Sequence, residues 1–354
     1  MVQSSSGYNM ETLAKKFAYA VAMTENQQGD FTWARGRAHS LYIGSKVESD
    51  SEFSNWLTSI IDTNQLAQAV RSSNHLKEFE HKFTNWILSH NSNQIIGLDG
   101  FHPDYSEGST QAFDSFYFRH RQRRFKCFVG EYFYHIKTWE ANQVDWDWLQ
   151  SVEDLASGDA LILSIPFCDT VVQRGDYDKL MQRCCELKIP VLLDLCYYII
   201  SNNIQVDLRY ACIDTVAFSL SKAWPISTAR IGMRYTRPEL FDGQKLHHSI
   251  GYNNNLGALI GVKVIDQYSA DYVYNERKIK YNTICNTLGL SPTQSVCFAI
   301  GDCNWNQYSR KELLKSYGLD FDPSLFVNRI CLNKIYQHWE LFRKFIKNET
   351  GTDI

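Results

Sequence analysis

The sequence lacks a long hydrophobic run, because no apolar stretch approaches the ~20 residues of a transmembrane helix. It also lacks an excess of one charge: 36 Lys and Arg face 39 Asp and Glu, for a formal net charge of -3. The balance leaves no basic footprint for nucleic acid or an anionic membrane surface. We therefore predict neither partner, and we interpret the densest basic run, residues 120–124, as a solvated helix end.

Paired cysteine motifs are also missing. The chain has 10 cysteines but no C-x-x-C pair; Cys184 and Cys185 are adjacent and the others are scattered. This pattern argues against a metal site and against a disulfide framework. We expect reduced thiols and a cytoplasmic protein.

The chain is long enough for more than one domain, with 354 residues of which 44% are hydrophobic. Between residues 93 and 235 short β-rich runs alternate with helical patterns such as residues 177–187. The predicted strands are residues 95–98, 126–129, 160–163, 191–193 and 215–218. This rhythm is typical of an α/β fold with a doubly wound, mostly parallel sheet.

One short segment combines an amine, two hydroxyls and a guanidinium: Lys222, Ser219, Ser221 and Arg230. The apolar residues 213–218 predict a strand, so Lys222 would lie at its carboxyl end, where open α/β sheets bind ligands. A lysine there can form a Schiff base with an aldehyde cofactor, and Arg230 can bind a phosphate bidentately while the serines donate to it. These groups suit pyridoxal 5'-phosphate (PLP). The structural alternative is a solvated surface lysine.

A second candidate strand ends on a carboxylate. Residues 191–193 are apolar, Asp194 follows them, and Tyr197 comes three residues later. An aspartate at that position can pair with the pyridinium nitrogen of PLP and make the ring a better electron sink. Tyr197 can donate to the phenolic oxygen of the ring. Alternatively, Asp194 caps the following helix and Tyr197 packs in the core.

Together these segments resemble the class I/II aminotransferase family, the aspartate aminotransferase-like, fold type I group of PLP-dependent enzymes. The resemblance rests on Asp-Leu-Cys-Tyr at 194–197, Ser-Leu-Ser-Lys at 219–222 and Arg-Ile-Gly at 230–232. Four more segments fall where the family places its own motifs: 108–112, 131–134, 164–170 and 328–331. The resemblance covers residues 108–331.

This resemblance implies a fold type I PLP-dependent transferase, with a large sheet domain and a small α+β domain built from both chain ends. We therefore predict three regions. Residues 1–90 are a helical segment of the small domain, 91–235 the PLP-binding domain, and 236–354 interdomain helices and the C-terminal small domain.

The resemblance also implies roles for individual residues. Lys222 holds PLP and then removes the Cα proton of an L-α-amino acid bound as the external aldimine. The other implied contacts are a phosphate loop of Gly108, Ser109 and Thr110, a ring of Tyr132 that stacks on the cofactor, and Arg329 for the α-carboxylate of the substrate. No metal is expected.

The chain departs from the family at its Asn-Pro-Thr-Gly turn. Cys168 and Asp169 replace Asn and Pro, and the glycine is missing. A thiol is a far weaker donor to the phenolic oxygen of PLP than an amide. Three interpretations stay open: an aminotransferase of amino acid metabolism, a lyase or cyclase of biosynthetic secondary metabolism acting on a hydroxylated amino acid, and a non-catalytic binding protein. Intact Lys222 and Arg329 argue against the last.

Three further expectations complete the interpretation. The family forms homodimers with shared active sites, to which residues 253–255 can contribute here. Its glycine-containing substrate loop is expected at residues 29–31 or 33–39. We expect Asp104 to be a solvated bystander rather than a pocket residue.

Overall fold

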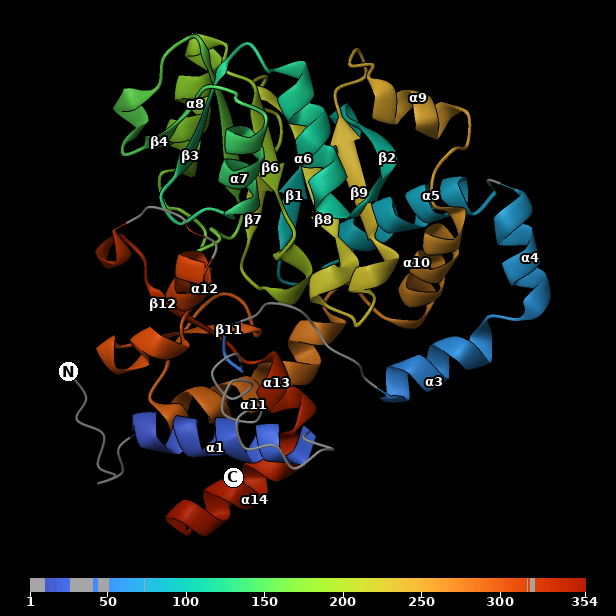
Figure 1. The fold of residues 1–354 in the computed structure, drawn as a ribbon. Coiled ribbons are helices and arrows are strands. Elements are labelled where there is room, and N and C mark those ends of the chain that lie inside the picture. The colour runs from blue at the N-terminus through green and yellow to red at the C-terminus, as the bar shows by residue number, and fades with distance from the viewer. Residues whose placement is uncertain (1–9, 26–40, 44–50, 73, 317, 319–321) are drawn as a thin grey trace. The chain divides into compact units, whose positions relative to one another are not determined.

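The computed structural model describes residues 10–25, 41–43, 51–72, 74–316, 318 and 322–354. The chain divides into two compact units (Figure 1), with Met1–Glu48 and Glu276–Ile354 in unit 1 and Ser49–Asn275 in unit 2. The candidate substrate-loop residues 29–31 and 33–39 lie outside the described residues.

Unit 2 is built on a seven-stranded sheet with the order β2-β9-β8-β6-β5-β3-β4. Neighbouring strands from β4 to β8 run parallel, whereas β9 is antiparallel to both β8 and β2. The strands are β2 (His102–Glu107), β3 (Arg124–Phe128), β4 (Trp146–Leu149), β5 (Asp159–Ser164), β6 (Val191–Asp194), β8 (Ile213–Ser219) and β9 (Ile231–Thr236). The predicted α/β fold with a mostly parallel sheet is confirmed.

The central strands are continuous apolar runs because both of their faces are covered. Every residue of β5, β6 and β8 is buried. The predicted strand at residues 95–98 is placed differently: β1 (Gln94–Ile96) pairs with β7 (Gln205–Asp207) in a separate two-stranded sheet. Two of the three residues of β1 are exposed, so it does not belong in a sheet covered on both faces.

Helices cover both faces of the main sheet. In β8, Thr215 accepts a hydrogen bond from Arg119 of α6 at 2.7 Å, whereas the ring of Phe218 packs on Phe83 of α5. Side chains three positions apart on a strand point to opposite faces, so α6 and α5 lie on opposite sides. The helices of unit 2 are α3 (Ser51–Ile60), α4 (Thr63–Arg71), α5 (Asn74–Leu88), α6 (Gly108–Arg119), α7 (Tyr134–Ala141), α8 (Tyr177–Leu187), α9 (Gly243–Ser249) and α10 (Asn255–Gln267).

A buried ion network ties β2 and β9 together. Arg234 of β9 donates to Asp104 of β2 at 2.7 Å and to Asp242 at 2.6 Å, and neither Arg234 nor Asp104 has more than 1% of its side chain exposed. The expectation of a solvated Asp104 is therefore wrong. The charge of Arg234 neutralises that of Asp104, so both side chains can be buried.

Unit 1 brings the two ends of the chain together in an α+β arrangement. Its antiparallel sheet contains β10 (Ser291–Pro292), β11 (Phe298–Gly301) and β12 (Asn328–Cys331). Its helices are α1 (Met10–Glu25), most of α11 (Tyr272–Leu288), α12 (Arg310–Ser316), α13 (Asn333–Gln337) and α14 (Trp339–Thr350). The ring of Phe17 in α1 lies edge-on to Phe342 in α14 at 4.9 Å, and Lys16 pairs with Glu349. The prediction of a small α+β domain from both chain ends is confirmed.

Other features can be stated for the described part of the chain. All ten cysteines are free thiols. Among the residues that the structure describes, no three His, Cys, Asp or Glu side chains are grouped to hold a metal ion. No helix in these ranges combines the length and apolar character needed to cross a membrane.

The buried network makes a stability prediction. Arg234→Met should lower the free energy of unfolding by about 3–5 kcal/mol, because it leaves Asp104 as an unpaired buried carboxylate. Arg209→Met is the matched control: its guanidinium also binds an aspartate, Asp207 at 2.6 Å, but is 69% exposed, so its loss should be far smaller than that of Arg234→Met. Urea denaturation of both variants measures the difference, and equal losses would contradict the prediction.

Candidate functional site

Six chain segments meet at one edge of the main sheet. The parallel strands β3, β5, β6 and β8 all end there. Because β9 is antiparallel to β8 and to β2, β2 points in the same direction as β8 and also ends there. The pairs Glu107↔Ile231 and Ser219↔Gly232 place the start of α6, the Lys222 segment and the Arg230 loop side by side. This is the edge at which α/β folds bind ligands.

The amino end of α6 forms a cradle for an anion. The residue before the helix, Glu107, makes no side-chain cap, so its side chain does not occupy the amide groups of the first turn. Gly108 has a positive φ of 70°. A Cβ on Gly232 would lie 2.5 Å from the carbonyl oxygen of Phe218 and 3.1 Å from the Cα of Gly108. Both glycines are therefore required for the close approach of this turn to the sheet, and a helix start of this kind binds phosphate.

Arg230 carries positive charge to the same place. Its Nη2 donates to Thr110 Oγ1 at 2.8 Å and to the carbonyl oxygen of Glu107 at 3.2 Å. The backbone at Arg230 is left-handed, with φ of 53°, a conformation that costs a non-glycine residue about 1–3 kcal/mol. Tyr105 donates to the carbonyl oxygen of Arg230 at 3.1 Å and holds this conformation in place.

The Lys222 segment forms a single turn after β8. Residues Leu220–Lys222 are a 3-10 helix capped by Ser219, whose Oγ accepts from the N–H of Ser221 at 3.2 Å. The two serine hydroxyls are also hydrogen-bonded to each other, at 3.1 Å. Lys222 lies close enough to Asp194 for its charge to lower the pKa of that carboxyl group.

Asp194 is a buried carboxyl group at the end of β6. Burial raises its pKa, whereas hydrogen bonds from Cys196, one of them from the N–H to Oδ1 at 3.0 Å, and the charge of Lys222 lower it. The alternative that Asp194 caps the following helix is wrong, because that helix, Tyr198–Ile200, begins after Tyr197 without a side-chain cap. Asp194 instead accepts from Cys196 within its own turn. A cation brought against this carboxyl would favour its ionised form.

Tyr132 lies among the same residues. Burial, with smaller contributions from Cys168, Asp194 and Cys196, raises the pKa of Tyr132 to about 12, and Arg230 acts in the opposite direction. Tyr197 follows Asp194 on a short turn and is 8% exposed, with its carbonyl oxygen accepting from Ser201 at 2.7 Å. Twelve residues were predicted for the site, and eleven of them lie in unit 2.

Arg329 is the exception, because it belongs to unit 1. It lies on β12, and its guanidinium carbon is 4.7 Å from the ring centroid of Phe298. Only 6% of the residue is exposed.

The turn after β5 has a left-handed residue at the position where the sequence lacks the glycine of the resembled family. Val171, at the position of the missing glycine, has the left-handed φ of 53° that glycine favours. Its N–H donates to the carbonyl oxygen of Phe167 at 2.8 Å. The side chain is fully buried, so packing holds a β-branched residue in a conformation that it rarely adopts.

Three residues beside the site were not among the predicted ones: Glu131, His135 and Cys196. Each is at most 7% exposed. Tyr117 and His135 Nδ1 share a hydrogen bond, and Asp194 is among the charges that raise the pKa of Tyr117. No local pattern marks Glu131 and His135, because their partners Ser164 and Tyr117 come from other segments, whereas Cys196 binds Asp194 within its own segment.

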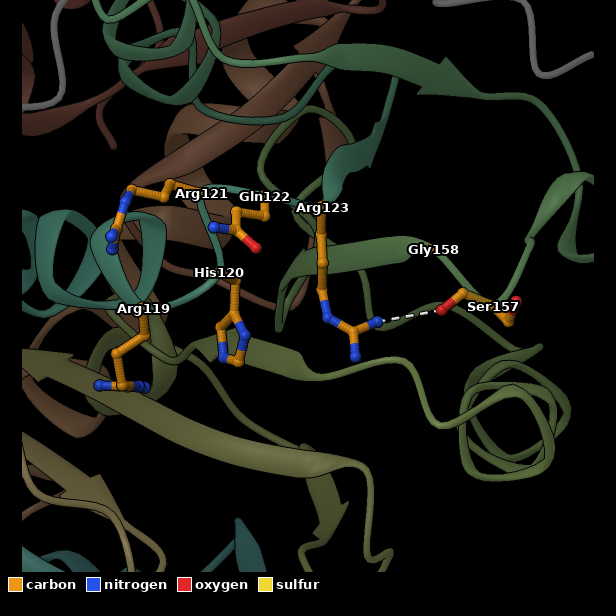
Figure 2. Close-up of a pocket in the computed structure, with 7 residues that line it drawn as sticks. All are labelled: Arg119, His120, Arg121, Gln122, Arg123, Ser157 and Gly158. Atoms are coloured by element: carbon orange, nitrogen blue, oxygen red, sulfur yellow. Dashed lines mark hydrogen bonds between the residues drawn. The ribbon is translucent and has the colours of Figure 1, made fainter.

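A hollow of about 540 Å³ lies at the other end of α6 (Figure 2). The helix has 12 residues, a length of roughly 18 Å, which separates the hollow from Gly108. The basic side chains that line the hollow already have partners there: Arg119 binds Asp242, His120 binds Asp214, Arg121 donates to the carbonyl oxygen of Phe118, and Arg123 donates to that of Ser157. We assign these residues a structural role.

No family model matches the sequence, and no curated protein matches it either. Solved structures do match the fold. A PLP-bound C-S lyase from Staphylococcus hominis is 12% identical with a TM-score of 0.60 and covers 97% of this chain and 98% of its own. An aspartate aminotransferase single mutant from Thermus thermophilus is 12% identical with a TM-score of 0.59 and covers 98% and 99%. An aromatic aminotransferase from Pyrococcus horikoshii is 12% identical with a TM-score of 0.58 and covers 88% and 96%.

The chain has the fold type I architecture of PLP-dependent transferases. The predicted fold is thus confirmed over nearly the whole chain. The start of α6, Lys222 and Asp194 all lie at the carboxyl ends of the parallel strands of this fold.

The buried histidine makes a pH prediction. Burial lowers the pKa of His135 from 6.5 to about 3. Below about pH 6.5 His135 binds a proton in the unfolded chain but stays neutral in the folded chain, so the free energy of unfolding falls as the pH falls. Between pH 7 and pH 5 this histidine should remove about 2 kcal/mol from the free energy of unfolding.

His135→Gln should lack that contribution. His90, whose pKa burial lowers to about 4, acts alike in both proteins. Urea denaturation of wild type and variant at pH 7 and pH 5 measures the difference. An identical loss of stability in the two proteins would mean that His135 does not stay neutral in the fold.

Proposed function

We propose that this protein is a PLP-dependent enzyme acting on an L-α-amino acid, and that it is an aminotransferase. The observation that carries the proposal is the meeting of Lys222, Asp194 and the Arg230–α6 cradle at one sheet edge. The fold of PLP-dependent transferases supports it.

The residues present fit the cofactor. The start of α6, without a side-chain cap, and the Arg230 guanidinium suit a phosphate, and Gly108 and Gly232 leave the backbone free to approach it. Ser219 and Ser221 can add hydroxyl donors. The buried carboxyl of Asp194, whose pKa burial raises, would be stabilised in its ionised form by a cation and suits a pyridinium nitrogen.

When bound, PLP withdraws electrons from the Cα of an attached amino acid. Asp194 would hold negative charge opposite the ring nitrogen and support that withdrawal. Lys222 would bind the cofactor covalently and, once displaced by the substrate, take the Cα proton on its Nζ. Tyr132 would stack on the ring, and Tyr197 and Cys168 would face its phenolic oxygen.

Arg329 would bind the α-carboxylate of the substrate and orient the Cα–H bond for proton removal. Its burial on β12 fits a guanidinium held in one orientation. The predicted domain limits at residues 90 and 235 and a cytoplasmic location are part of the same proposal.

A lyase or cyclase is the second candidate. Cys168 favours it, because the strong amide donor of the aminotransferase turn is replaced by a thiol. One structure of similar fold is described as a C-S lyase. Such an enzyme would lose a leaving group from the substrate side chain and need no amino acceptor.

We also propose a homodimer with shared active sites. Helix α4 carries the apolar residues Leu66 and Val70 with 40% and 81% of their surface exposed, which suits a subunit contact. Asn253–Asn255 would lie near the neighbouring site.

Covalent attachment of the cofactor provides the first test. The protein incubated with PLP should turn yellow, and borohydride should fix a pyridoxyl group on the peptide that contains Lys222. Lys222→Ala should lose this label, whereas the exposed control Lys179→Ala should keep it, since Lys179 is 63% exposed and pairs with Glu153. Peptide mass spectrometry reads the result; a wild-type protein without label on Lys222 would overturn the proposed function.

The reaction type needs a separate test. With a panel of amino acids, an aminotransferase consumes substrate only when pyruvate or 2-oxoglutarate is added as acceptor. Lys222→Ala should lower turnover by about 10²–10⁴-fold, because the group that moves the Cα proton is gone. Release of ammonia, a thiol or water without any keto acid would reject the aminotransferase assignment in favour of the lyase or cyclase.

A further inference from the structure

Glu131 is a buried carboxylate that the proposed chemistry does not use. It lies between β3 and α7, and only 2% of the residue is exposed. Its Oε1 accepts from the N–H of Ser164 at 2.7 Å. Its Oε2 accepts from the hydroxyl of Ser164 and from the N–H of Tyr132 at 3.3 Å. A buried charge that accepts several hydrogen bonds holds the donating groups in fixed positions.

The groups that Glu131 joins belong to two sides of the candidate site. Ser164 is the last residue of β5, and its neighbour across the sheet is Asp194. The N–H of Ile165, the next residue, donates to the carbonyl oxygen of Asp194 at 2.9 Å. Tyr132 comes directly after Glu131 in the chain. One carboxylate thus links the backbone of Tyr132 to the strand pair that carries Asp194.

A second close contact restricts the same turn. Gly130 has a positive φ of 102°, and a Cβ there would lie 2.7 Å from the Cβ of Asp169. The turn that carries Tyr132 is therefore pressed against the turn that carries Cys168. Glu131 and Asp169 thus hold the backbone at Tyr132 from two sides.

We infer that Glu131 is a positioning residue that sets the orientation of the Tyr132 ring for stacking on the cofactor. The inference rests on the proposed function. Its physical basis is the acceptor capacity of the carboxylate: glutamate accepts with both oxygens, whereas a glutamine in its place puts an NH₂ group against N–H or O–H donors. The glutamine then loses its hydrogen bonds either to Ser164 or to the N–H of Tyr132, so the backbone of Tyr132 is no longer held to Ser164.

A double-mutant cycle on the full-length protein tests this link. The four proteins are wild type, Glu131→Gln, Tyr132→Ala and the double variant, each freed of cofactor and titrated with PLP. Glu131→Gln should weaken PLP binding by about tenfold, the size of a lost aromatic stacking contact. It should also change the visible circular dichroism of the bound cofactor, which reports the orientation of the ring.

In the Tyr132→Ala background the same substitution should change PLP affinity by less than about twofold, because the ring through which it acts is absent. Glu140→Gln is the matched control: Glu140 lies on α7, pairs with Lys137 and is 44% exposed, and its substitution should leave the affinity and the dichroism unchanged. Ser164→Ala removes one donor from Glu131 with less risk to folding, and should show a smaller loss with the same dependence on Tyr132.

The outcomes separate the two proposals. The role of Glu131 is supported if Glu131→Gln weakens PLP binding about tenfold in the wild-type background and changes it by less than about twofold in the Tyr132→Ala background. Equal weakening in both backgrounds, or a fall in stability with unchanged affinity and dichroism, overturns it and leaves Glu131 a structural residue. If wild type itself does not bind PLP, the proposed function fails, and the inference fails with it.

Discussion

The common direction of β2, β3, β5, β6 and β8 is the constraint on which the candidate site depends. Since these strands end at one edge of the sheet, the residues after them meet there although they are far apart in the sequence. The antiparallel strand β9 completes the edge, because it starts immediately after Arg230. Its pairing with both β2 and β8 brings Gly232 against Gly108. The backbone register therefore fixes the cradle, and the side chains then supply its charge.

The edge is electrically polarised. Positive charge gathers at the start of α6 through Arg230 and the helix amides, whereas the end of β6 carries the carboxyl of Asp194. The charge of Lys222 acts on Asp194: burial raises the pKa of that carboxyl group, and the amine lowers it without cancelling the effect of burial. A ligand with a phosphate at one end and a cation at the other would complement both poles. Binding of that cation and ionisation of Asp194 are thus linked.

Strands buried on both faces were the part of the fold most predictable from the sequence. The apolar runs of β5, β6 and β8 were identifiable, and helix Tyr177–Leu187 was predicted with the bounds that it has. β2 and β9 were not, because Asp104 and Arg234 resemble surface residues until they neutralise each other inside the fold. The placement of Lys222, Asp194 and Arg230 at or next to strand ends could be predicted from the apolar strands beside them. Glu131 and His135 could not, because their partners Ser164 and Tyr117 come from other segments and the burial of a polar side chain leaves no local signal.

In the altered turn after β5, the backbone conformation and the hydrogen-bond donor are set by different residues, Val171 and Cys168. Val171 has the left-handed conformation that glycine adopts readily, at a cost of about 1–3 kcal/mol that burial of the valine side chain offsets. The change is in the donor at Cys168, which lies near Tyr132 and Asp194. The donor at Cys168 is therefore the side-chain difference that bears on the proposed choice between an aminotransferase and a lyase or cyclase.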